Sequence, residues 1–172
     1  MEKINIKKQL DRFASKSLPL WEEFPDLELY MDQLVSLGNR YLNGLLETKI
    51  TASMVNSYVK KGLMSRPQKK KYNAQHLAEL LVISLLKSVY SLDTVKSYNA
   101  ELLHEFSPKE SYNGFANLFN ETLKSIANSQ LPPTPNTRSL NTLTKYLIIN
   151  AVIYKLLGEN LLDYSLTQTK KL

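Results

Sequence analysis

The chain of 172 residues contains no cysteine and only two histidines. The absence of cysteine excludes disulfides, a thiolate nucleophile and cysteine-ligated metal sites, and two histidines make a histidine-rich metal site unexpected. No nucleophile is paired with a base, and no glycine-rich loop has the spacing that cradles a phosphate. We therefore expect a protein that is not an enzyme and that holds neither a metal nor a cofactor.

Long apolar runs are also missing. The longest apolar stretch, 146–157, is interrupted by Asn150 and Lys155 and is too short to cross a bilayer. The first eight residues include three lysines, but the apolar segment of a secretory signal does not follow them. We therefore expect a cytoplasmic protein that does not contact a membrane.

Glycine is scarce, with five residues in the chain. No run alternates apolar and polar residues over the length of a core strand, whereas apolar residues recur at helical spacing in nearly every segment, so we expect an all-α fold. Thr51 is expected to cap one helix and Gly62 to end it in a left-handed conformation. The expected helices cover about 25–47, 51–61, 73–89, 91–103, 108–126 and 139–157.

Acidic residues are absent from one segment. Residues 48–78, which we name the acid-free segment, contain seven basic side chains and no acidic one. The other 15 basic residues are balanced by the 16 acidic residues of the chain, so the net charge of +6 comes from this segment alone. A local cation cluster on an otherwise balanced chain is typical of proteins that bind a polyanion, most often nucleic acid.

The expected helix 51–61 has two different sides. Ser53, Asn56, Ser57 and Lys60 fall on one side, at positions i, i+3, i+4 and i+7. This polar side has no carboxylate, and in a major groove Asn pairs with adenine, Ser with several base edges, and Lys with guanine or phosphate. We predict that these four residues face DNA bases; the alternative is an ordinary solvated helix surface.

A basic turn, residues 66–72, follows this helix with the sequence Arg-Pro-Gln-Lys-Lys-Lys-Tyr. Such a turn can hold phosphates while the neighbouring helix reads bases. For Tyr72, packing under the turn is an equally good interpretation, and the alternative for the whole turn is a solvated charged loop. The residues predicted to contact phosphate are Lys49, Lys61, Arg66, Lys69, Lys70, Lys71 and Tyr72.

Several spaced motifs run through residues 20–110. They are Met54-Val-Asn-Ser-Tyr-Val-Lys-Lys-Gly-Leu-Met64, then Pro67, Tyr72, the leucine-rich stretch 77–86, Ser91-Leu92 and Val95. Together they resemble the MerR-type winged helix-turn-helix. The sequence Lys49–Leu63, with Leu29–Gln33 upstream, more closely resembles the signature of a bacterial family of unknown function described as MerR-like. The resemblance implies a short basic wing and sequence-specific binding to double-stranded DNA, as in a bacterial transcription regulator.

The sequence departs from this pattern within the helix. MerR-type recognition helices usually have Arg where Asn56 stands and Tyr where Ser57 stands, and the wing here lacks its usual glycine. The base contacts of well-studied members therefore do not transfer to this chain. The sequence does not identify a small-molecule effector, and the absence of cysteine excludes a thiol metal sensor.

The resemblance divides the chain into three expected regions. They are an N-terminal docking segment (1–24), a winged helix-turn-helix DNA-binding domain (25–106) and a helical dimerisation or effector region (107–172). The segment Leu131–Thr137, with three of the seven prolines, is the clearest linker.

Helix-turn-helix proteins commonly bind paired half-sites as dimers, so we expect a homodimer. The alternative for the apolar stripe of the last helix is core packing against residues 113–128. A protein-interaction adapter is the alternative function; it would use this stripe and dock the acid-free segment on an acidic protein surface. The candidate dimer residues are Tyr146, Ile149, Val152, Ile153 and Leu156.

Overall fold

The computed structural model describes residues 6–103, 106–128, 130 and 134–169. Over these residues the chain is helical and forms no extended strand, which confirms the all-α prediction. Of the expected linker, residues 131–133 lie outside the described residues, and 134–137 have no regular secondary structure. The helices are α1 (Ile6–Ala14), α2 (Met31–Tyr41), α3 (Ala52–Lys60), α4 (Ala74–Leu86), α5 (Leu92–Leu103), α6 (Pro108–Ala127) and α7 (Leu140–Thr169), with a short 3-10 turn at Trp21–Glu23.

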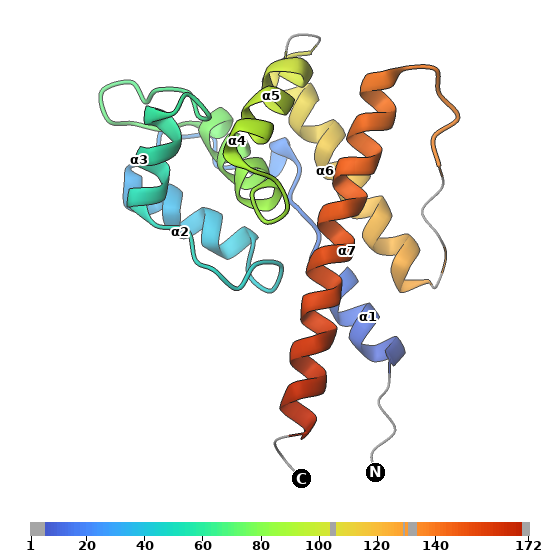
Figure 1. The fold of residues 1–172 in the computed structure, drawn as a ribbon. Coiled ribbons are helices and arrows are strands. Elements are labelled where there is room, and N and C mark those ends of the chain that lie inside the picture. Colours follow the sequence, from blue (N-terminus) through green and yellow to red (C-terminus); the bar gives the residue numbers. More distant parts are fainter. Residues whose placement is uncertain (1–5, 104–105, 129, 131–133, 170–172) are drawn as a thin grey trace.

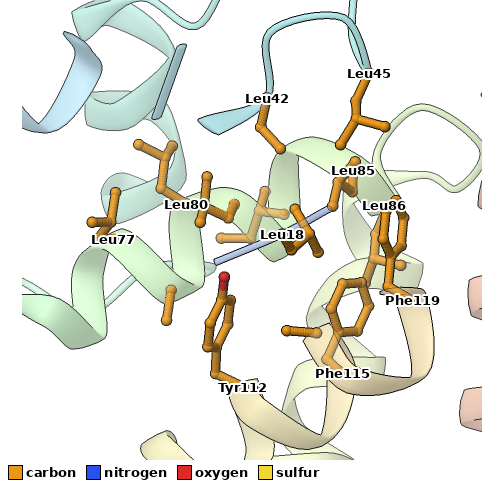
Figure 2. Close-up of a cluster of buried hydrophobic side chains, with 14 of the residues drawn as sticks. Leu18, Leu42, Leu45, Leu77, Leu80, Leu85, Leu86, Tyr112, Phe115 and Phe119 are labelled. Carbon is orange, nitrogen blue, oxygen red and sulfur yellow. The ribbon is translucent and has the colours of Figure 1, made fainter. Parts of the chain in front are cut away.

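The helices α4 and α6 form the centre of the fold. Nine of the 13 residues of α4 are buried, as expected for a helix that is apolar on most of its sides. Tyr112, Phe115 and Phe119 of α6 point toward the leucines of α4, and Leu42 and Leu45 lie over the same cluster (Figure 2). Around this centre, α2 and α3 lie at one side of the molecule and α7 at the other (Figure 1).

A glycine in α2 makes room for side chains that pack between α2 and α4. Gly38 is buried inside α2, and a Cβ atom at this position would lie 3.1 Å from both Ile50 and Leu80. Gly38 therefore does not break the helix; its missing side chain lets α2 and α4 pack tightly. The chain leaves α2 at Leu42 and turns at Gly44, whose φ of +81° is accessible mainly to glycine.

The segment between α1 and α2 is held on α6 by two asparagines. Asn120 accepts a hydrogen bond from Leu18 N (2.8 Å) and donates one to Leu18 O (2.9 Å). About two turns earlier in α6, Asn113 accepts a hydrogen bond from Trp21 N (2.8 Å). Because the two asparagines are seven residues apart, they lie on the same side of α6 and fix an extended stretch of chain along it.

Three expected helix boundaries were wrong. The helix expected to start at Pro25 starts at Met31, because the main chain of Leu29 is paired with that of Tyr72 through N···O distances of 2.7 and 2.8 Å and is therefore extended. The helix also ends before Leu42, whereas it was expected to reach Glu47. The last helix was expected to end near Leu157, but α7 continues to Thr169.

Candidate nucleic-acid interface

The helix α3 begins and ends where its local sequence predicts. Thr51 caps it by accepting a hydrogen bond from Met54 N (3.3 Å), and Gly62 follows its end with a φ of +70°. Val55 and Tyr58, at 0% and 3% exposure, fix the inner side of the helix in the core. Both the cap and the left-handed stop are therefore confirmed.

The outer side of α3 carries the four residues predicted to face bases. Ser53, Asn56 and Lys60 are exposed, and Ser57 is half-buried. No described residue forms a hydrogen bond or an ion pair with any of these four side chains. Their polar groups are thus available to an external partner, and their contact with bases stays a prediction.

The basic turn has an unusual backbone at its tip. Gln68 and Lys71 face each other through two main-chain hydrogen bonds of 3.2 and 2.8 Å, with Lys69 and Lys70 between them at φ values of 49° and 63°. Two positive φ angles define the tight hairpin turn that normally selects Asn-Gly. A non-glycine residue in this conformation costs on the order of 1 kcal/mol. The turn therefore presents two exposed ammonium groups in a conformation that lysine does not favour.

Two contacts hold the base of this turn. The Lys71 ammonium lies 2.7 Å from the Glu28 carboxylate, which raises the pKa of Lys71. Tyr72 pairs through its main chain with Leu29, is only 4% exposed, and meets His76 edge to face at a centroid distance of 5.3 Å. Burial also raises the pKa of the Tyr72 hydroxyl.

These positions correct one of the residues predicted to contact phosphate and give a second one an internal partner. Tyr72 packs under the turn, which is the second interpretation of its sequence position. Lys71 is already paired with Glu28, so it carries less free charge than its neighbours in the sequence. Tyr72 therefore supports the basic turn from beneath, and contact of Lys71 with phosphate stays a prediction.

The remaining predicted phosphate contacts are exposed cations. Within the part of the chain that the structure describes, no carboxylate lies within 4.0 Å of their charged groups. These residues are Lys49, Lys61, Arg66, Lys69 and Lys70.

The acid that directly follows the acid-free segment is used internally. Glu79 on α4 accepts hydrogen bonds from Ser65 N (2.8 Å), Ser65 Oγ (2.7 Å) and Gln75 Nε2 (2.9 Å). This carboxylate therefore holds the chain that enters the basic turn. It does not pair with any of the exposed cations of the segment.

Sequence reasoning missed one cation of this surface. Lys96 on α5 donates a hydrogen bond from Nζ to Lys61 O (3.0 Å), directly after the end of α3. A cation at a helix C-terminus interacts favourably with the last carbonyl groups. Lys96 lies 35 residues away along the chain and outside the acid-free segment, so no local pattern signals this position.

The residues predicted to form a dimer seam lie in the core of a single chain. Ile149, Val152 and Ile153 have 0% exposure and Leu156 has 4%, while Tyr146 is half-buried. The four buried residues belong to the same cluster as Phe115 and Phe119, which is the core-packing alternative for this stripe. The four buried side chains are inaccessible to a second protein, so neither a dimer nor an adapter can use them in this fold.

Among the described residues, no helix is both long and apolar enough to span a bilayer. The same residues hold no group of three or more His, Asp or Glu side chains placed to bind a metal ion.

A family model matches residues 19–121, and its family is described as a domain of unknown function, DUF1836. The chain belongs to this family. No curated protein and no solved structure matches the chain. The resemblance to a family of unknown function is thus confirmed at this level. The DUF1836 region includes α2, α3 and the basic turn, together with Asn113 and Asn120 of α6.

Proposed function

We propose that this DUF1836 protein binds double-stranded DNA in a sequence-specific manner, as a bacterial transcription regulator with a MerR-like winged helix-turn-helix. In this proposal α2 and α3 are the two helices and the basic turn is the wing. One observation carries the proposal. The polar side chains on the outer side of α3 have no partner among the described residues, and the chain after this helix forms a tight turn with two exposed lysines. Figure 1 shows the loop after α3 returning beside that helix.

The two parts of this surface suit different tasks. A major groove about 12 Å wide admits an α-helix, and the short side chains of Ser53 and Asn56 suit close contact with base edges. Lys69 and Lys70 extend from the turn, where point charges can hold phosphates without reading sequence. Lys96 adds a further cation beside the end of α3.

The phosphate role is tested by measuring duplex affinity at several salt concentrations. The double variant Lys69→Asn with Lys70→Gly removes two charges and fits the hairpin turn better than the native pair. We expect weaker binding to all sequences and a salt slope smaller by about 0.9 for each lost phosphate contact. The matched control, Lys124→Gln with Arg138→Gln, removes the same charge from exposed positions elsewhere.

Two results would contradict the phosphate assignment. If the Asn-Gly variant binds duplex as tightly as the wild type at every salt concentration, the turn does not hold phosphates. If the control weakens binding to the same extent, only the net charge matters. A complete absence of salt-dependent duplex binding would instead favour the adapter, with an acidic protein on the acid-free segment.

Base reading is tested by selecting preferred sites from random duplexes. Asn56→Ala should reduce the preference for the selected site by about 1–3 kcal/mol, the worth of one good bidentate base contact. Its affinity for unrelated duplex should stay unchanged. The control Asn117→Ala removes an exposed asparagine of α6 and should alter neither quantity. An unchanged preference in the Asn56 variant would remove this residue from the recognition surface.

A further inference from the structure

The helix α7 has a second apolar side opposite the one that packs in the core. Leu147, Tyr154 and Leu162 are 56%, 47% and 59% exposed, although Ile149 and Val152 of the same helix are fully buried. A helix in a soluble protein normally has charged or polar residues on the side opposite its core-facing apolar stripe. On this outer side of α7 the apolar side chains are instead exposed, and no described residue of the same chain buries them.

The outer residues form one continuous line. Their spacing of three or four residues keeps them on a single side of the helix over about 29 Å. The line contains no charged residue, and two of its members are small. We name it the exposed α7 stripe: Leu143, Leu147, Ala151, Tyr154, Gly158 and Leu162.

We propose that the exposed α7 stripe joins two copies of this chain in an antiparallel, two-fold arrangement. The reason is that the stripe is complementary to itself. When two α7 helices run in opposite directions and cross between Val152 and Ile153, Leu147 of one copy lies opposite Gly158 of the other. In the same register Tyr154 lies opposite Ala151, and the stripe ends with Leu143 opposite Leu162.

In the four central contacts a large side chain thus meets a small one, a leucine pair closes each end of the stripe, and the two-fold axis repeats every contact. This is the condition for an interface that one surface forms with its own copy. Gly158 has room for such a contact, because a Cβ atom there would meet nothing within 4 Å in the single chain. The inference uses different residues from the proposed DNA surface and does not depend on DNA binding.

One helix pair of this length lies at the small end of specific interfaces. We therefore expect a reversible monomer–dimer equilibrium with a dissociation constant in the micromolar range. Sedimentation velocity of the full chain across that concentration range measures it. A protein that stays monomeric at all these concentrations would overturn the proposal.

The substitution Gly158→Leu tests the stripe directly. It fills the space that Leu147 of the second copy would occupy, while the open surroundings of Gly158 leave the single chain undisturbed. We expect the dimer to weaken at least tenfold, with an unchanged helical circular dichroism spectrum and no loss of thermal stability. The control Ala100→Leu adds the same side chain at an exposed position of α5 and should leave the equilibrium unchanged.

A size swap then tests the register. Leu147→Ala combined with Gly158→Leu exchanges the large and small partners, so the dimer of the double variant should be stronger than that of Gly158→Leu alone. If the double variant is no stronger, the antiparallel register is wrong. If Gly158→Leu dimerises as well as the wild type, the two copies meet through a different surface and the proposal fails.

Discussion

Asn39 near the end of α2 is bonded twice to the main chain of Ile50, immediately before α3. Asn39 Nδ2 donates to Ile50 O (2.9 Å), and Ile50 N donates to Asn39 Oδ1 (2.8 Å). One side-chain amide therefore closes the loop that separates the two helices. The placement of α3 on α2 depends on this amide as well as on the apolar packing of Val55 and Tyr58.

Replacing Asn39 by Leu should lower the free energy of unfolding by about 1–3 kcal/mol, because it leaves buried polar groups of Ile50 unpaired. Urea denaturation measures this change. Asn39→Asp keeps the acceptor and loses the donor, so its effect should be intermediate. The control Asn43→Ala removes an exposed amide in the same loop and should stay within about 0.5 kcal/mol. Equal effects at both positions would contradict the role of Asn39.

The left-handed backbone of Lys69 and Lys70 predicts a gain in stability from a better turn sequence. Lys69→Asn with Lys70→Gly should raise the free energy of unfolding by about 1 kcal/mol, since these residues accept positive φ more readily. Lys69→Gln with Lys70→Gln removes the same charges and keeps the steric cost. If the two double variants are equally stable, the gain comes from charge and not from the backbone.

Two buried tyrosines provide a matched pair of hydroxyl deletions. Tyr58 and Tyr112 are both 3% exposed. The Tyr112 hydroxyl donates to Pro19 O (2.8 Å), whereas the Tyr58 hydroxyl has no hydrogen-bond partner among the described residues. Tyr112→Phe should therefore cost about 1 kcal/mol of stability, and Tyr58→Phe should be neutral or stabilising. Thermal and urea unfolding compare the two variants, and the reverse order would contradict this assignment.

The pKa of Glu22 is lowered from 4.5 to about 2, chiefly by the hydrogen bond from Lys109, with help from its own main-chain N–H and from Asn113. A carboxyl group whose pKa falls on folding stabilises the protein above its unfolded pKa, and this contribution is lost as the pH falls from 4.5 toward 2. An NMR titration of the carboxyl carbon should show the lowered midpoint. Lys109→Gln should move the midpoint back toward its ordinary value, and Lys124→Gln should not.

Local signals in the sequence predict α3 well. The Thr51 cap and the Gly62 stop act within one turn of the helix, and the structure has both. The start of α2 follows a different rule, because it depends on Leu29 pairing with Tyr72. These residues are 43 positions apart in the sequence. Their contact therefore overrides the helical signal at Pro25, and a reading of neighbouring residues cannot predict it.

The dimer candidates show a second limit of sequence reasoning. Both sides of α7 are apolar, so periodicity cannot tell which side enters the core. The structure buries the side with Ile149 and Ile153 and exposes the side with Leu147 and Leu162. The contact of Lys96 with the end of α3 could not be predicted either, because the two residues that form it are 35 positions apart in the sequence. The polar side of α3, in contrast, follows from the spacing of its residues alone.

The asparagine contacts of α6 also have a consequence for synthesis of the chain. Leu18 and its partner Asn120 are separated by 102 residues, so at about 5–20 residues per second the ribosome needs roughly 5–20 s to make the second after the first. During that interval Leu18 and Phe24 have no helix α6 to cover them. We therefore expect the nascent N-terminal segment to be the part most exposed to chaperones and to aggregation before the chain is complete.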